Sequence, residues 1–404
     1  MEILELKKSV KTLVSERLDF RRDFTDEEVH DLIDEVMLEQ KEMTILSIPQ
    51  RRQLHTEVFD SLRRLDVLQA FVDDKSVTEI MVNGPNSIFI ERNGSLIRVG
   101  EQFESEGKMR DVIQLLVLSA NRTVNEANPI VDSRLTDGSR VNVVLNPIAI
   151  DGPIITIRKF PEKPITMDDL ISYGSISIEA AEFLEKCVRA KYNIFVSGGT
   201  GSGKTTFLNV LSDYIPQDER VITIEDSAEL QLHSVENLVR LETRNANSEG
   251  CSEITIRDLI KSSLRMRPDR IIVGEVRGAE AFDMLQCLNT GHDGSMSTGH
   301  ANSAHDMLSR LENMVLMGSL LPLEVIRGQI ANGLDIIVHL SRLRDKSRRV
   351  MEISEVLGYE NGEILTRTLY GFEYSHEDVG GRIVGELKKK AEMSNIFKLD
   401  LAGL

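Results

Sequence analysis

The chain has 404 residues, of which 41% are hydrophobic and 28% charged, a composition that supplies a sizeable core and excludes a disordered chain. Its net charge of −17 counts against a protein whose main partner is duplex DNA, because such proteins present basic surfaces to phosphates. The three cysteines (Cys187, Cys251 and Cys287) are far apart and form no CxxC pair, which excludes a disulfide framework or zinc ribbon and favours a reducing compartment.

The first 65 residues are predicted to be helical. Apolar side chains recur at helical spacing over residues 6–14, 29–37 and 54–65, and Thr25 begins a capping box with Glu28. The N-terminus lacks the uninterrupted apolar core of a signal peptide. No later stretch approaches the roughly 18 apolar residues of a membrane-spanning helix. A small three-helix unit and a docking module for a partner are both open interpretations.

Residues 70–160 are predicted to form an α+β domain. Short strands flank two turn signals, Asn93-Gly94 and Asp137-Gly138, and residues 108–120 have the pattern of a helix. Pro161 and Pro164 then indicate a linker.

Residues 166–404 alternate short apolar strands with helices. Continuous apolar runs such as NIFVS, VITIED and RIIVGEV are typical of strands that are buried on both faces. The alternation predicts an α/β domain with a mostly parallel sheet covered by helices. A hairpin is expected around Asn361-Gly362.

The segment Gly198–Thr205 satisfies the phosphate-loop pattern GxxxxGK[ST] and lies between a predicted strand and a predicted helix. Glycines let the backbone curl so that several N–H groups face one anion, and the helix N-terminus adds partial positive charge. We expect Lys204 to reach the β- and γ-phosphates of ATP and the Thr205 hydroxyl to ligate Mg²⁺. The residues assigned to nucleotide binding are Gly199, Thr200, Gly201, Ser202, Gly203, Lys204, Thr205 and Thr206.

Acidic residues follow two of the predicted strands. Glu275 ends RIIVGE, with Gly274 where most phosphate-loop proteins have aspartate, and we assign Glu275 to the metal and to positioning water. Glu225 ends VITIE and is the candidate general base, because ligands of α/β sheets bind at the carboxyl ends of strands. Glu229 is a second candidate, and a solvated acidic turn is the alternative for Asp226 and Glu229.

Two Gly-His pairs lie in TGHDGSMSTGHANS. His300 follows the predicted strand and is assigned to sensing phosphate, whereas His292 precedes the strand and has either a structural or a relay role.

In chain order, the segments GGTGSGKT, TIED, IIVGEVRG and TGHDGSMSTGHANS resemble the type II/type IV secretion ATPase superfamily, in which they are called Walker A, Asp box, Walker B and His box. The glycine before Glu275 is typical of that family. MVNGPNSIFIERNG and DSRLTDGSRVN are similar to its N-terminal domain. With the helical leader, the combination is most similar to the CpaF-like ATPases of tight-adherence (Tad) pili.

The resemblance implies a RecA-like P-loop ATPase core at residues 166–404, preceded by a smaller α+β, PAS-like domain at 70–160 and a helical leader at 1–65. It implies ATP and Mg²⁺, a homo-hexameric ring, and inner-membrane platform proteins as partners. The protein is then expected to be a cytoplasmic motor, peripheral to the inner membrane, that powers the assembly or secretion of pilin-like subunits.

By resemblance, Arg134 and Arg140 match arginines that reach the phosphates from the smaller domain, and Arg158 lines the same cleft. Arg134 and Arg140 stand on the two arms of one predicted hairpin, which allows both guanidinium groups to converge on one anion. Arg240 and Arg244 are expected on an irregular stretch. The sequence does not distinguish whether they make an intersubunit contact or belong to a plain surface.

Two other classes of function are compatible with a phosphate loop. A ring-shaped nucleic-acid translocase shares the RecA-like core, but the acidic charge and the absence of tryptophan count against nucleic acid as a partner. A nucleotide-dependent switch or scaffold binds ATP with poor turnover and does not need both acidic motifs.

Overall fold

The computed structural model describes residues 3–18, 22–92, 94–118, 122–160, 164–244 and 252–404. The chain forms two compact units, Met1–Lys163 and Pro164–Leu404, and each is described by itself. Asn93, Pro161 and Cys251, all singled out above, lie outside the described residues. Among the helices that the structure describes, none combines the length and apolar content needed to cross a bilayer.

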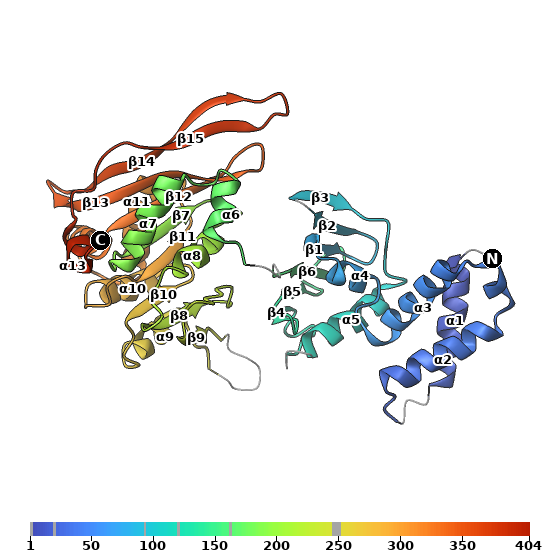
Figure 1. Cartoon of the computed structure of the whole chain (residues 1–404). Coiled ribbons are helices and arrows are strands. Elements are labelled where there is room, and N and C mark those ends of the chain that lie inside the picture. The colour runs from blue at the N-terminus through green and yellow to red at the C-terminus, as the bar shows by residue number, and fades with distance from the viewer. Residues whose placement is uncertain (1–2, 19–21, 93, 119–121, 161–163, 245–251) are drawn as a thin grey trace. The chain divides into compact units, whose positions relative to one another are not determined.

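The first unit begins with a three-helix bundle, as the apolar stripes predict. Its elements are α1 (Ile3–Arg17), α2 (Asp26–Glu39), the 3-10 helix η1 (Lys41–Ile45) and α3 (Ile48–Arg63) (Figure 1). Val10, Ile33 and Val58 are fully buried among the three helices. The predicted capping box is confirmed: Glu28 N donates to Thr25 Oγ1 (3.2 Å), and Thr25 N donates to Glu28 Oε2 (2.9 Å).

A six-stranded antiparallel sheet with the order β3-β2-β1-β6-β5-β4 follows the bundle. Its elements are η2 (Asp66–Leu68), α4 (Gln69–Asp73), β1 (Val77–Asn83), β2 (Ile88–Arg92), β3 (Ser95–Arg98), α5 (Glu106–Leu118), β4 (Ile130–Arg134), β5 (Arg140–Val144) and β6 (Ile154–Arg158). Helix α5 covers one face, where Met109 and Ile113 pack with Ile80, Val141 and Ile157. The opposite face carries both polar side chains, such as Asn142 and Thr156, and apolar ones, such as Met81 and Phe89.

The second unit is built on a nine-stranded sheet with the order β15-β14-β13-β12-β7-β11-β10-β8-β9. Its strands are β7 (Ile194–Gly198), β8 (Arg220–Glu225), β9 (Asn237–Glu242), β10 (Arg270–Val273), β11 (Met296–Gly299), β12 (Ile336–Arg342), β13 (Arg348–Glu360), β14 (Glu363–Glu377) and β15 (Ile383–Lys389). The strands from β12 to β9 are parallel, and β13, β14 and β15 extend the sheet antiparallel. The predicted mostly parallel α/β sheet is therefore confirmed.

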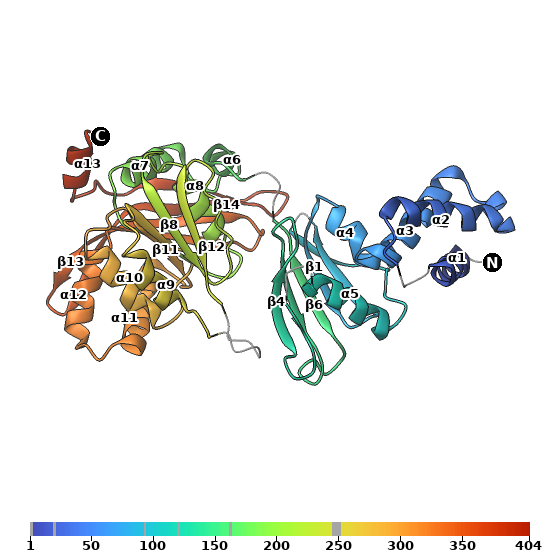
Figure 2. The same ribbon diagram turned by 90° about the horizontal axis from the view of Figure 1, so that it is seen from below.

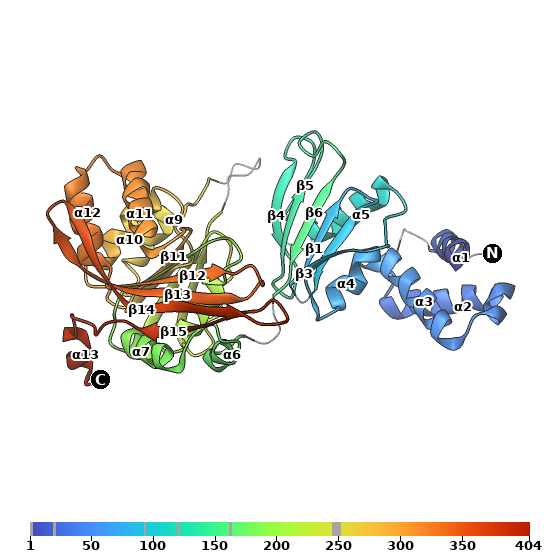
Figure 3. The same cartoon turned by 90° about the horizontal axis from the view of Figure 1, so that it is seen from above.

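Helices cover both faces of this sheet, with α6–α8 on one side and α9–α12 on the other (Figures 2 and 3). The helices are α6 (Met167–Ser172), α7 (Ile178–Arg189), α8 (Lys204–Ser212), α9 (Ile256–Ser263), α10 (Glu280–Leu288), α11 (Ala304–Gly318), α12 (Leu323–Gly333) and α13 (Phe397–Ala402). In β7, Ile194 and Val196 pack on the first side and Phe195 on the second. Burial on both faces explains why these strands are continuous apolar runs.

One local prediction was wrong. Arg240 does not lie on an irregular stretch but in β9, which pairs with β8 in parallel. Its NH2 donates to the Leu230 carbonyl (3.0 Å), and Arg244 donates to the Ser252 carbonyl (3.1 Å from NH2). Polar side chains at an edge strand break the apolar pattern from which strands are recognised, and that is why β9 was missed.

At the amino-terminal edge of the sheet, a buried ion pair joins three elements. The Arg270 side chain, fully buried at the start of β10, donates to both Glu219 carboxylate oxygens (2.5 and 3.1 Å) and to the Val188 carbonyl (2.7 Å). A Cβ added to Gly294, whose φ is +79°, would lie 2.6 Å from Arg270 NH1. The glycine of the Asp293-Gly294 pair that follows His292 is therefore required by the packing of Arg270.

Arg270→Met is expected to destabilise the folded chain by about 3 kcal/mol, the low end for breaking a buried ion pair, because Lys191 still contacts Glu219. Urea unfolding followed by circular dichroism measures the loss. Arg189→Met is the matched control: Arg189 is 54% exposed in its ion pair with Glu185, and that change should cost at most about 1 kcal/mol. Equal effects of the two substitutions would contradict the assignment.

Candidate active site

The predicted motifs meet at the carboxyl edge of the parallel strands. The phosphate loop follows β7, Glu225 ends β8, Glu275 follows β10 and His300 follows β11. Since these strands are parallel neighbours, their carboxyl ends share one edge of the sheet, the edge at which α/β proteins bind ligands.

The glycines of the phosphate loop are required by its geometry. Gly201 and Gly203 have φ of +69° and +93°, a left-handed conformation that side chains disfavour. A Cβ added to Gly198 would collide with the Leu340 carbonyl oxygen of the neighbouring strand β12. Helix α8 begins directly after Gly203, so its free N–H groups and partial positive charge face the loop. This combination is what an anion site needs.

Lys204 is largely buried, with 8% of its surface exposed. Its Nζ donates to the Gly199 carbonyl (3.1 Å) and lies 3.3 Å from His300 Nδ1. Burial lowers the pKa of Lys204, and the nearby Glu275 carboxylate opposes that shift. The ammonium is thus held inside the loop, where it can neutralise phosphate charge.

His300 connects Lys204 with Glu275. Its Nε2 lies 2.9 Å from Glu275 Oε1, on the side of the ring opposite the Lys204 contact. Burial, and next the Lys204 charge, lower the pKa of His300, which favours the neutral ring. In the neutral ring, Nδ1 accepts from Lys204 Nζ. His300 Nε2 is close to Glu275 Oε1, but that oxygen accepts no hydrogen bond within the described residues.

Glu275 also accepts a hydrogen bond from a residue that the sequence did not single out. Arg277 NH2 donates to Glu275 Oε2 (2.6 Å), whereas Oε1 lies beside His300 Nε2. The bond to Glu275 raises the pKa of Arg277. Residues 275 and 277 flank Val276, and side chains at i and i+2 lie on one side of an extended chain, which is the signal by which Arg277 could have been found.

Glu225 has a different environment from Glu275. Its side chain is 3% exposed, and its Oε1 accepts hydrogen bonds from the backbone N–H groups of Glu229 (2.7 Å) and Leu230 (2.9 Å). A Cβ added to Gly274 would lie 2.8 Å from Glu225 Cγ. Glycine stands in place of the usual aspartate because Glu225, from the adjacent strand β8, occupies that space.

In the first unit, three arginines form one row across the sheet. Arg134 in β4 is the direct partner of Arg140 in β5, which is in turn the direct partner of Arg158 in β6. Arg158 pairs across to Glu79 in β1, and its Nε lies 3.5 Å from Glu79 Oε1. Directly opposed side chains point to the same face, here the face away from α5. The row therefore gathers positive charge on the face away from α5.

The two Gly-His pairs lie beyond opposite ends of β11. His300 follows the strand and joins the motifs above, whereas His292 precedes it, at the amino-terminal edge beside Gly294. This position favours a structural role for His292 over a relay role, because the length of β11 separates His292 from the phosphate loop.

The residues at the carboxyl edge fit Mg-ATP. The loop offers inward-curled backbone, a helix N-terminus and Lys204 to the phosphates. Ser202 Oγ is a buried oxygen that lacks a hydrogen-bond partner within the described residues. Thr205 and Glu275 supply the hydroxyl and carboxylate oxygens that Mg²⁺ prefers.

Sequence reasoning missed further polar residues on β12 and β13. His339 is buried beside the phosphate loop, with its Nδ1 2.9 Å from Ser197 Oγ, and burial lowers its pKa. Arg348 Nε donates to the Gly201 carbonyl (2.9 Å). These contacts depend on β12 lying beside β7, which no local pattern indicates.

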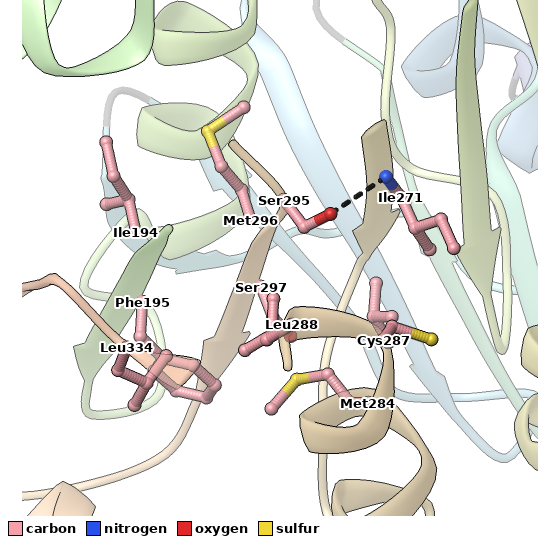
Figure 4. Close-up of a pocket in the computed structure, with 11 residues that line it drawn as sticks. Ile194, Phe195, Ile271, Met284, Cys287, Leu288, Ser295, Met296, Ser297 and Leu334 are labelled. Atoms are coloured by element: carbon pink, nitrogen blue, oxygen red, sulfur yellow. Dashed lines mark hydrogen bonds between the residues drawn. The ribbon is translucent and has the colours of Figure 1, made fainter. Parts of the chain in front are cut away.

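An internal cavity of about 10 Å³ lies in the sheet core between β7, β10, β11 and α10 (Figure 4). Phe195, Met284 and Leu288 are among its apolar lining residues, and Ser295 Oγ accepts from Ile271 N (3.0 Å). Room for about one water molecule excludes it as a nucleotide site.

Comparison with known proteins agrees with this geometry. The model of a family described as "Type II/IV secretion system protein" matches residues 62–383. A Mycobacterium tuberculosis (strain CDC 1551 / Oshkosh) protein named for conjugal transfer is 35% identical over 351 residues, which span 83% of this chain and 98% of that protein. The type IV secretion system protein VirB11 of Bartonella quintana is 28% identical over 325 residues, 70% of this chain and 90% of its own length.

Among solved structures, the chain is similar to the ATPase DotB of Legionella pneumophila. The TM-score is 0.51 at 20% identity, and the match covers 73% of this chain and 80% of DotB. At this identity the likeness supports the fold, a RecA-like core with an N-terminal domain.

Proposed function

Since the chain belongs to the type II/IV secretion system protein family and is an ATPase of that family, we propose that it works as a hexameric motor on the cytoplasmic face of the inner membrane. The motor would power assembly or export of pilin-like subunits, with a membrane platform protein as its partner. The CpaF-like motif combination favours a tight-adherence pilus as the filament. We further propose that residues 1–65 form a domain separate from residues 70–160.

One observation carries the proposal. Lys204, His300, Glu275 and Arg277 form a continuous chain of contacts that joins the phosphate loop, the strand end after β11 and the strand end after β10. A nucleotide phosphate that draws Lys204 toward itself changes the partners of His300 and hence of Glu275. Phosphate binding and water activation are thereby coupled through side chains, as a hydrolysing motor requires and a passive binding protein does not.

In the proposed reaction, the loop N–H groups and Lys204 hold the ATP phosphates and neutralise the charge that develops on the γ-phosphoryl group. The Glu275 carboxylate orients the attacking water and accepts its proton. Glu225, the candidate base from the sequence, is the alternative in this role, although its Oε1 accepts two backbone hydrogen bonds. Thr205 and Glu275 would hold Mg²⁺, which supplies Lewis-acid stabilisation of the phosphate oxygens when it is bound.

Arg134 and Arg140 are proposed to contribute from the first unit, in the same subunit or a neighbouring one. Two guanidinium groups directly opposite each other, with Arg158 next in the row, suit a ligand that carries several negative charges. Release of phosphate would then free the first unit to move, which is the mechanical step of the proposed cycle.

Glu275→Gln tests this function. The variant should keep ATP binding and assemble into a hexamer with ATP, whereas turnover falls about a hundredfold or more, because a general base is lost but the phosphate contacts remain. Native mass spectrometry gives the assembly, and phosphate release gives turnover. A cytoplasmic fragment of the platform protein should stimulate the wild type but not this variant.

Glu280→Gln is the matched control, since Glu280 is a nearby acid whose Oε1 accepts from the backbone of Arg277 and Gly278. Loss of nucleotide binding together with turnover in Glu275→Gln would mean a mainly structural role for Glu275. A monomeric mass for the ATP-bound chain would refute the ring.

A further inference from the structure

The hairpin between β12 and β13 lies beside the phosphate loop. In the register of β12 against β7, His339 is the partner of Ser197 and Leu340 the partner of Gly198 (Figure 3 shows β12 within the sheet). Arg342, two residues after Leu340, therefore lies beyond the level of Gly198, the first glycine of the loop. The hairpin returns through a turn and brings Arg348 directly opposite Arg342.

Both arginines reach the tip of the phosphate loop. Arg348 Nε donates to the Gly201 carbonyl (2.9 Å), and its Cδ would lie 3.4 Å from a Cβ added to Gly203. Arg342 NH1 would lie 3.6 Å from a Cβ added to Gly201. Both side chains are largely exposed, and within the described part of the chain no hydrogen bond or ion pair holds the Arg342 guanidinium.

The turn between the two arginines is rigidly built. Asp345 Oδ1 accepts hydrogen bonds from Ser347 N (3.0 Å) and Ser347 Oγ (2.6 Å), while its Oδ2 accepts from Ile383 N in β15 (2.8 Å). Leu343 N also donates to the Ser347 carbonyl (2.8 Å). A fixed turn holds Arg342 and Arg348 close together although like charges directly opposite each other repel. An anion beside them would relieve that repulsion.

We propose that the β12–β13 hairpin is a second wall of the nucleotide site, in which Arg342 binds the polyphosphate and Arg348 positions the loop. A trans peptide directs its C=O and N–H groups to opposite sides. By binding the Gly201 carbonyl from outside, Arg348 fixes the peptide plane that carries the Ser202 N–H. Arg342 places a positive charge at the same tip, and its strand β12 lies on the flank of β7 opposite to β11 and β10, which lead to His300 and Glu275.

This inference rests on the proposed function, since it assigns further residues to the same ATP site. Arg342→Ala should weaken binding of ADP and of inorganic tripolyphosphate alike by about tenfold, the size of one charge-assisted hydrogen bond. Arg348→Ala should raise the KM for ATP about tenfold with little change in kcat, and Arg348→Lys, which keeps a donor, should restore most of it. Displacement of a fluorescent ADP from the full-length chain measures the affinities.

Arg344→Ala is the matched control, because Arg344 lies in the same turn but is paired with Glu377 (2.6 Å). It should bind ADP and tripolyphosphate like the wild type. Wild-type affinities in Arg342→Ala and Arg348→Ala would overturn the inference, and so would a loss for ADP without a loss for tripolyphosphate, which points to the base or ribose. Failure of the wild type itself to bind ATP would instead refute the proposed function.

Discussion

Lys204→Ala is expected to abolish ATP turnover while the fold remains intact. Lys204 is the only lysine of the phosphate loop, and its ammonium is held between the Gly199 carbonyl and His300. Alanine removes the charge that faces the β- and γ-phosphates and also ends the chain of contacts that leads to Glu275. Phosphate release by the purified full-length variant, followed at saturating ATP and Mg²⁺, measures the loss.

Lys186→Ala provides the matched control, since Lys186 is an exposed lysine in the last turn of α7. Its turnover should equal that of the wild type, and both variants should unfold at the wild-type temperature. Near wild-type turnover by Lys204→Ala would refute the assignment of the loop as the ATP site.

Arg134→Ala and Arg140→Ala are each expected to lower hydrolysis roughly a thousandfold, the low end for arginines that stabilise a phosphoryl transition state. ATP binding should change much less, because the phosphate loop supplies most of the ground-state contacts. Single-turnover hydrolysis and equilibrium binding of ATP, measured on the same preparations, separate the two effects.

Arg110→Ala serves as the control for these two variants. Arg110 belongs to the same unit but pairs with Glu106 on helix α5, so its removal should leave turnover unchanged. Wild-type hydrolysis by both Arg134→Ala and Arg140→Ala would show that the row is a surface feature. A structure with bound nucleotide in which neither guanidinium lies near the phosphates, from either subunit, would lead to the same conclusion.

The sequence predicted the parts of the site that follow from local pattern. The phosphate loop was recognisable because its glycines, Lys204 and Thr205 are contiguous and stand between a strand and a helix. Glu225, Glu275 and His300 were found because each ends an apolar strand, and parallel strands align their ends. The pairing of Arg134 with Arg140 followed from the two-residue turn signal between them.

The contacts of the site that the sequence did not predict depend on the order of the strands in the sheet. Nothing local indicates that β12 lies beside β7, so the contact of His339 with Ser197 and that of Arg348 with the loop could not be predicted. Strand β9 was missed because its edge position leaves polar residues in it, among them Arg240. Long-range pairing is decided by packing of the whole sheet rather than by neighbouring residues.

Because Glu225 and Gly274 are in contact, the residue at one of these positions limits which residue fits at the other. Strands β8 and β10 are neighbours, and the Glu225 side chain fills the volume above Gly274. An aspartate at 274, the residue of most phosphate-loop proteins, fits only beside a shorter side chain at 225. An engineer who wished to place aspartate at 274 would therefore have to exchange both residues together.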